Sequence, residues 1–158
     1  MTDGVSAGQV MVSLSVHVED LADPSLSRYE DSQSPSWPEV TQSIRRLDGA
    51  SYVGISMGRW VLGSTPEDPG ETLYVDGGGR DRVRVLHMSE TEEGTALYRL
   101  VEKARGEELE WGVADSQGVE LPARLWVTKE LALRAVRYLF SQGGRDPALD
   151  WELEAISG

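Results

Sequence analysis

Histidine, serine and carboxylate groups are the side chains through which this chain could act as a catalyst. It contains two histidines, His17 and His87, and no cysteine. A hydrolytic triad places a histidine beside a serine on a sharp turn. Ser56 stands between glycines in VGISMG, but the alternation around it is typical of an ordinary strand. We therefore expect no enzyme, and a small enzyme stays open only if either histidine faces a pocket with carboxylates around it.

A metal or cofactor site has no clear signature in the sequence. Zinc is held by histidine and cysteine at characteristic spacings, and His17 and His87 do not have the H-E-x-x-H spacing. Their strand-like surroundings favour polar strand positions instead. We predict that the chain holds no metal and no cofactor.

The glycine-rich stretch LYVDGGGRDRVRV, residues 73–85, could cradle a phosphate or form a tight turn. A phosphate loop needs a helix whose N-terminus faces the anion. The residues after Gly79 alternate between polar and apolar instead, as do Leu73 and Val75 before the glycines. We predict a β-hairpin in which residues 77–79 adopt the positive φ angles of the turn.

Length and charge restrict the class of protein and its partners. The chain has 158 residues, the length of one domain, and carries 15 Lys and Arg against 27 Asp and Glu, a net charge of −12. Such a charge repels nucleic acid and anionic membranes and attracts basic partners. No apolar run is long enough to span a bilayer, and the N-terminus lacks a signal-peptide pattern. We expect a cytoplasmic protein that contacts neither nucleic acid nor membrane.

Acidic residues gather in three stretches, Glu19–Asp31, Ser89–Gly94 and Gly106–Gln117. Three such clusters in a chain with no visible active site favour a binding role with a basic groove as the partner. The carboxylates around the middle of the chain are predicted to line one edge of the sheet and to contact that partner. They are Glu90, Glu92, Glu93, Glu107, Glu108 and Glu110.

Tryptophan supplies the other candidate contact. Four of the five tryptophans, Trp37, Trp111, Trp126 and Trp151, lie on segments where a core position is natural. Trp60 lies between two glycine-bounded loops, so it could be an exposed interface anchor, with a core position as the alternative.

The elements that must position these residues follow an α+β pattern. A strand with Val12, Leu14, Val16 and Val18 on one face is followed by a predicted loop at 20–35. Ser36 and Glu39 have capping-box spacing at the start of a helix whose core stripe contains Trp37, Val40, Ile44 and Leu47.

The second half of the chain is predicted to be mostly strands before a late helix. Strands are expected from residue 52 to about 118, with Leu97, Leu100 and Val101 also compatible with a helical turn. Pro122 restricts the strand VELPARLWV to an edge or a bulge. Thr128 begins the clearest helix, Gly143 and Gly144 end it, and a short strand with Leu149, Trp151 and Leu153 on one face follows. We predict one domain over residues 1–158, with residues 1–9 loose, built from a single mostly antiparallel sheet with two helices packed against it.

Three segments resemble the small immunity proteins of bacterial polymorphic toxin systems, in particular the first-numbered immunity family, often encoded beside deaminase toxins. They are SWPEVTQSIRRLDGASYVGISM, LYVDGGGRDRVRV and LALRAVRYLFSQGGRDPALDWE. Together they cover most of residues 37–152. The matching residues are Trp37, Leu47, Asp48, Gly49, Gly78, Gly79, Gly144, Pro147, Trp151 and Glu152.

The resemblance implies that the chain, a monomer when free, binds a cognate toxin domain and occludes its active site. The toxin would be basic and act on nucleic acid, as a deaminase in preference to a nuclease. An acidic nucleic-acid mimic that regulates a DNA-binding protein would share the same charge. A neighbouring toxin gene would distinguish the two.

Overall fold

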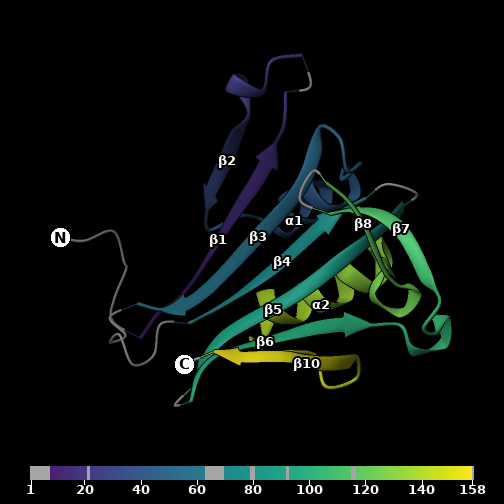
Figure 1. Cartoon of the computed structure of the whole chain (residues 1–158). Helices are drawn as coiled ribbons and strands as arrows, with labels where there is room; N and C mark the ends of the chain where they lie inside the picture. The colour runs from purple at the N-terminus through teal and green to yellow at the C-terminus, as the bar shows by residue number, and fades with distance from the viewer. Residues whose placement is uncertain are drawn as a thin grey trace.

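The computed structural model describes residues 8–20, 22–62, 70–78, 81–91, 93–114 and 117–157. It is α+β, as predicted: two helices pack on a twisted antiparallel sheet, and both lie on one side of it (Figure 1). The eight-stranded sheet has the order β10-β6-β5-β4-β3-β1-β2, with β9 paired to β5, and β7 and β8 form a separate two-stranded sheet. The strands are β1 (Val10–Val18), β2 (Arg28–Gln33), β3 (Tyr52–Val61), β4 (Glu71–Gly77), β5 (Arg82–Thr91), β6 (Gly94–Val101), β7 (Leu109–Ala114), β8 (Gln117–Pro122), β9 (Val127–Thr128) and β10 (Asp150–Ser157).

Alternation of side chains divides the eight-stranded sheet into a core face and an outer face. The core face carries buried residues at alternate positions, among them Leu14 and Val16 of β1, Ile55 of β3 and Val75 of β4. The antiparallel register places Val16 opposite Ile55, and Ile55 opposite Val75. These rows of apolar side chains form the floor on which the helices pack.

The first helix, α1 (Trp37–Arg45), begins as the sequence predicts. Ser36 is the N-cap, and its hydroxyl accepts a hydrogen bond from the amide of Glu39 at 3.3 Å. Val40 and Ile44 are completely buried against the sheet. Asp48 then organises the exit from the helix, because its Oδ1 accepts hydrogen bonds from the amides of Ala50, Ser51 and Tyr52. These backbone donors outweigh the effect of burial, so the pKa of Asp48 lies below its ordinary value.

The second helix, α2 (Lys129–Ser141), also has the predicted cap and apolar stripe. The Thr128 hydroxyl accepts a hydrogen bond from the amide of Leu131 at 3.1 Å. Ala132, Ala135, Val136 and Leu139 are buried. No helix in the described ranges is long and apolar enough to cross a membrane.

The prediction of a loop over residues 20–35 is wrong for residues 28–33, which form a strand. The 3₁₀ turn η1 (Pro24–Leu26) is followed by β2, which pairs with β1 and forms one edge of the sheet. The β2 sequence RYEDSQ has no apolar alternation because the strand is exposed along almost its whole length. Of residues 1–9, which the sequence predicts to be loose, residues 1–7 lie outside the described residues. Gly8 donates to the carbonyl of Leu62, and Gln9 accepts from the amide of Leu62, just after β3.

Later elements resolve the ambiguous segments. Residues 94–101 form β6, a strand and not a helical turn. The predicted strand VELPARLWV divides into three parts: β8, which ends at Pro122, the turn η4 (Ala123–Leu125), and β9. Pro122 therefore occupies an edge strand, as predicted.

The glycine-rich stretch forms the predicted hairpin between β4 and β5. Gly77 and Gly78 have φ angles of +103° and +112°, whereas Gly79 lies outside the described residues. A Cβ on Gly78 would collide with the backbone of Leu47. Gly77 likewise leaves space for the carbonyl of Val113, only 2.7 Å from where its Cβ would lie. These glycines admit neighbouring backbone of the same chain, so they do not form an open phosphate cradle.

Candidate functional site

The outer face of the sheet holds a trough of about 420 Å³. Its floor is on β1 and β3, where the outward positions carry small residues: Ser15 on β1, and Gly54 and Ser56 on β3. In the register, Ser15 lies opposite Ser56. Glycine within a strand weakens it and often marks a place where another backbone or a ligand approaches closely. The small residues therefore make a depression in a face that both helices leave uncovered.

One wall of the trough is formed by an aromatic stack at the β1–β2 edge. The rings of His17 and Tyr29 are 4.7 Å apart and almost parallel, and Tyr29 is 66% exposed. His17 Nε2 lies 3.0 Å from Glu19 Oε1, and the Ser15 hydroxyl donates to Asp31 at 2.6 Å. The wall thus consists of the two stacked rings, and the carboxylates of Glu19 and Asp31 lie beside it and contact His17 and Ser15.

The opposite wall comes from β4, β5 and β6. Tyr74 is 37% exposed and lies opposite Ser56 on one side and Leu86 on the other. Met88 and Leu97 extend this wall as an apolar surface. At its end, Arg84 forms a two-point ion pair with Asp76, with distances of 3.0 and 2.7 Å.

The trough combines the candidate catalytic groups His17 and Ser56 with an apolar and aromatic lining. His17 meets one condition for an enzyme, since it lines a cleft with carboxylates nearby. Its Nε2 faces Glu19, however, and no described hydroxyl group is hydrogen-bonded to it. Ser56 lies in the middle of β3 and not on a sharp turn. An apolar and aromatic surface with a few placed polar groups is typical of a recognition site.

The second histidine is part of the core. His87 is 3% exposed, and its Nε2 lies 2.6 Å from Glu71 Oε1. Glu71 also accepts a hydrogen bond from the amide of Gly144 just after α2, at 2.9 Å. Burial alone would raise the pKa of Glu71, but these hydrogen bonds and the charges of His87 and Arg59 hold that pKa below its ordinary value. This pair joins β4, β5 and the end of α2.

The acidic residues that the sequence singles out do not line one edge of the sheet. Glu90 and Glu93 lie at the β5–β6 turn, whereas Glu107, Glu108 and Glu110 follow the other end of β6. The eight residues of β6 separate the two groups by about 25 Å. Glu92 lies outside the described residues. The predicted continuous acidic edge is thus wrong, because the intervening segment is an extended strand.

Two of these carboxylates form ion pairs within the chain, and a third accepts a hydrogen bond from a hydroxyl group. Glu107 Oε2 lies 2.6 Å from Arg124, and Glu110 forms an ion pair with Arg105. Glu90 accepts a hydrogen bond from Thr95 at 2.6 Å. Glu108 is exposed and has no cationic partner among the described residues.

One tryptophan is placed differently from expectation. Trp111, predicted in the core, is 56% exposed, because β7 leaves the main sheet and forms a hairpin with β8. Trp126 is buried beneath that hairpin, where Gly112 of β7 leaves room for its ring. Trp60 is half-buried on the outer face of β3, outside the residues that line the trough.

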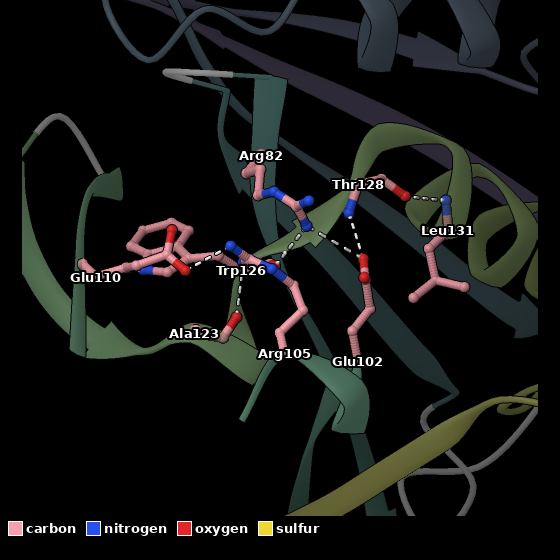
Figure 2. Close-up of polar contacts among 8 residues, drawn as sticks. All are labelled: Arg82, Glu102, Arg105, Glu110, Ala123, Trp126, Thr128 and Leu131. Atoms are coloured by element: carbon pink, nitrogen blue, oxygen red, sulfur yellow. Dashed lines mark hydrogen bonds and ion pairs between the residues drawn. The ribbon is translucent and has the colours of Figure 1, made fainter. Parts of the chain in front are cut away.

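A network centred on Arg105 anchors the β7–β8 hairpin (Figure 2). Arg105, in the turn η3 (Lys103–Arg105), donates to the carbonyls of Ala123 and Trp126, both at 2.8 Å, and pairs with Glu110. The network continues through the Trp126 carbonyl, which accepts a hydrogen bond from Arg82 at 3.3 Å.

From Arg82 the contacts lead to the start of α2. Arg82 lies 3.5 Å from Glu102, whose Oε1 accepts a hydrogen bond from the amide of Thr128 at 2.8 Å. Thr128 in turn caps α2 through the amide of Leu131, and Figure 2 shows the whole path. The hairpin is therefore connected to the body by charged hydrogen bonds and not only by the chain.

The residues that carry the family resemblance hold the scaffold together. Leu47 is buried, and its carbonyl accepts a hydrogen bond from Lys129 at 2.7 Å. The Trp151 indole donates to the carbonyl of Asp146 at 3.1 Å, and Glu152 pairs with Arg124. The hydrogen bond with Arg124 is the main reason why the pKa of Glu152 lies below its ordinary value. None of these contacts lies in the trough.

Sequence reasoning did not find Tyr29, Tyr74 or the trough between them. The available signal was the run of small residues at alternate positions of two strands, Ser13 and Ser15 on one and Gly54, Ser56 and Gly58 on the other. Its meaning depends on β1 and β3 being neighbours, which only the structure shows.

Within the described ranges, no three histidine or acidic side chains come together as metal ligands. Comparison of the chain with models of protein families, with curated proteins and with solved structures finds no match.

Proposed function

We propose that this chain is an immunity-type protein, which binds a basic bacterial toxin domain across the outer face of its sheet and thereby occludes the toxin's active site. The observation that carries the proposal is the trough between Tyr29 and Tyr74. It is a preformed concave surface with exposed aromatic rings, the features that concentrate binding energy in protein interfaces.

The charge of the chain supports a basic partner. With a net charge of −12, the chain attracts a positively charged domain over long range and speeds the encounter. Beside the trough, Asp31 accepts the Ser15 hydroxyl and has no cationic partner among the described residues, while within the trough Arg84 faces Asp76. A toxin that acts on nucleic acid carries the complementary positive groups in its active site.

The sequence resemblance supports the toxin part of the proposal. It concerns scaffold residues such as Leu47, Asp48 and Trp151, so it bears on the kind of fold and not on the contact surface. Toxins encoded beside the resembling family are often deaminases, which makes a nucleobase deaminase the preferred partner over a nuclease.

Co-expression with the C-terminal toxin domain encoded by the neighbouring gene tests the proposal. We expect that cells survive the toxin domain when this chain is present, and that the two purify as a complex of one copy each. The toxin domain expressed with an unrelated acidic protein is the control. Absence of both rescue and complex would reject the proposed function.

A further inference from the structure

We propose that the outer face of the β7–β8 hairpin is a second contact surface for the basic partner, with Trp111 as its anchor. This inference rests on the proposed function and adds a surface that is separate from the trough. None of the residues that line the trough belongs to the hairpin.

The first observation is the exposure of two large apolar side chains on one face of the hairpin. Leu109 is 60% exposed and Trp111 is 56% exposed, and alternation places both on the same side of β7. A single exposed apolar residue is common, but two together on one hairpin face, one of them a tryptophan, indicate an interaction site.

The second observation is that the opposite face of the same hairpin is already packed. Gly112 lies against the ring of the buried Trp126, and the Trp126 indole donates to the carbonyl of Glu110 at 3.1 Å. The hairpin therefore uses one face to join the body and leaves the face with Trp111 open. The conformation of Trp111 is also fixed locally, because its ring lies over Gly118 on the neighbouring strand.

The third observation is that the hairpin is held in advance of binding. Arg105 joins the carbonyls of Ala123 and Trp126 to the carboxylate of Glu110, and the path continues to α2 (Figure 2). An anchor on a preorganised element loses little conformational freedom on binding.

Charge determines which occupant the surface accepts. Glu108 and Glu120 border the apolar residues and are exposed, and neither pairs with a cation among the described residues. A second copy of this chain would bring these like charges together. A partner with an apolar pocket bordered by lysine and arginine would compensate them. We therefore assign the face to the same basic toxin domain.

The test measures the affinity of three alanine variants, at Leu109, Trp111 and Leu153, for the purified toxin domain. Leu109→Ala and Trp111→Ala should each weaken binding, with Trp111→Ala at least about 30-fold weaker, as expected for an interface hot spot. Leu153→Ala is the matched control, because Leu153 is also half-exposed on a strand but lies on β10. Its affinity should equal that of the unchanged chain.

Amide hydrogen exchange on the unchanged chain provides a second measurement, which does not depend on whether the variants fold. In the complex of the unchanged chain, amide hydrogen exchange should slow in β7 and β8. If the unchanged chain binds the toxin but Trp111→Ala binds equally well and β7 is not protected, this inference alone is rejected. If the unchanged chain does not bind, both the proposed function and the inference are rejected.

The oligomeric state of the free chain tests the alternative occupant. Dimers that form with increasing concentration and that Trp111→Ala abolishes would assign the face to self-association and overturn the inference.

Discussion

Glu71 of β4 lies 2.6 Å from the buried His87 of β5, measured from Oε1 to Nε2, and the same partly buried carboxylate accepts a hydrogen bond from the amide of Gly144. The pair thus connects two central strands to the chain just after α2. A partly buried carboxylate that accepts several hydrogen bonds contributes to stability mainly while it is ionised.

The pH dependence of unfolding should show this contribution. The pKa of Glu71 is lowered by folding, so its contribution is complete above the unfolded-state pKa of about 4.3 and is lost as pH falls through the folded-state pKa. We expect Glu71→Gln to lower the free energy of unfolding by about 1–3 kcal/mol at pH 7 and by progressively less below pH 4.3. Denaturant unfolding across this range measures it, with the exposed Glu130→Gln as control. An equal loss at every pH would contradict the assignment.

Gly78 should tolerate alanine far less well than Gly106. Both have a positive φ, +112° and +80°, but a Cβ on Gly78 meets the backbone of Leu47 whereas one on Gly106 meets nothing within 4 Å. Gly106→Ala should cost about 1 kcal/mol from backbone strain alone, and Gly78→Ala about 2 kcal/mol more from the collision. Thermal unfolding of the two variants compares them. Equal losses would show that the hairpin turn can move away from Leu47.

Arg105 should determine how firmly the β7–β8 hairpin is attached. Arg105→Met retains most of the side-chain volume but removes the donors to Ala123 and Trp126. We expect faster amide exchange in β7 and β8 and a loss of about 1–3 kcal/mol in the free energy of unfolding. Arg134→Met is the control, since Arg134 is exposed on α2 and makes no ion pair with the described residues. Unchanged amide exchange in β7 and β8 would show that Arg105 does not anchor the hairpin.

The reaction that the toxin catalyses can be determined from the nucleic acid of cells exposed to it. If the toxin is a nucleobase deaminase, sequencing of DNA and RNA after exposure should reveal base transitions, and this chain should suppress them. Strand breaks without transitions would instead identify a nuclease, while leaving the binding role of this chain intact.

Most of the fold follows from local patterns. Ser36 and Thr128 identify the starts of both helices, and alternation identifies β1, β3 and the glycine hairpin, because each signal depends on neighbours in the sequence. β2 was not predictable in this way, since an exposed edge strand needs no apolar face.

The candidate site was less predictable, because it depends on contacts between distant segments. Trp111 has the alternation of a core strand, and only the departure of β7 from the main sheet exposes it. The trough exists because Ser15 and Ser56 lie opposite each other on neighbouring strands, a register that the sequence does not specify.

The most direct test of the central claim is the affinity of a chain whose trough has been filled. Ser56→Tyr places a large, strand-compatible side chain on the floor, while Gln42→Tyr makes the same addition at an exposed position of α1, across the sheet. With the neighbouring toxin domain in a calorimeter, we expect Gln42→Tyr to bind as the unchanged chain does. Ser56→Tyr should bind at least about 30-fold more weakly, which is the loss expected when a principal interface contact is removed. A folded Ser56→Tyr chain that binds with undiminished affinity would contradict the account.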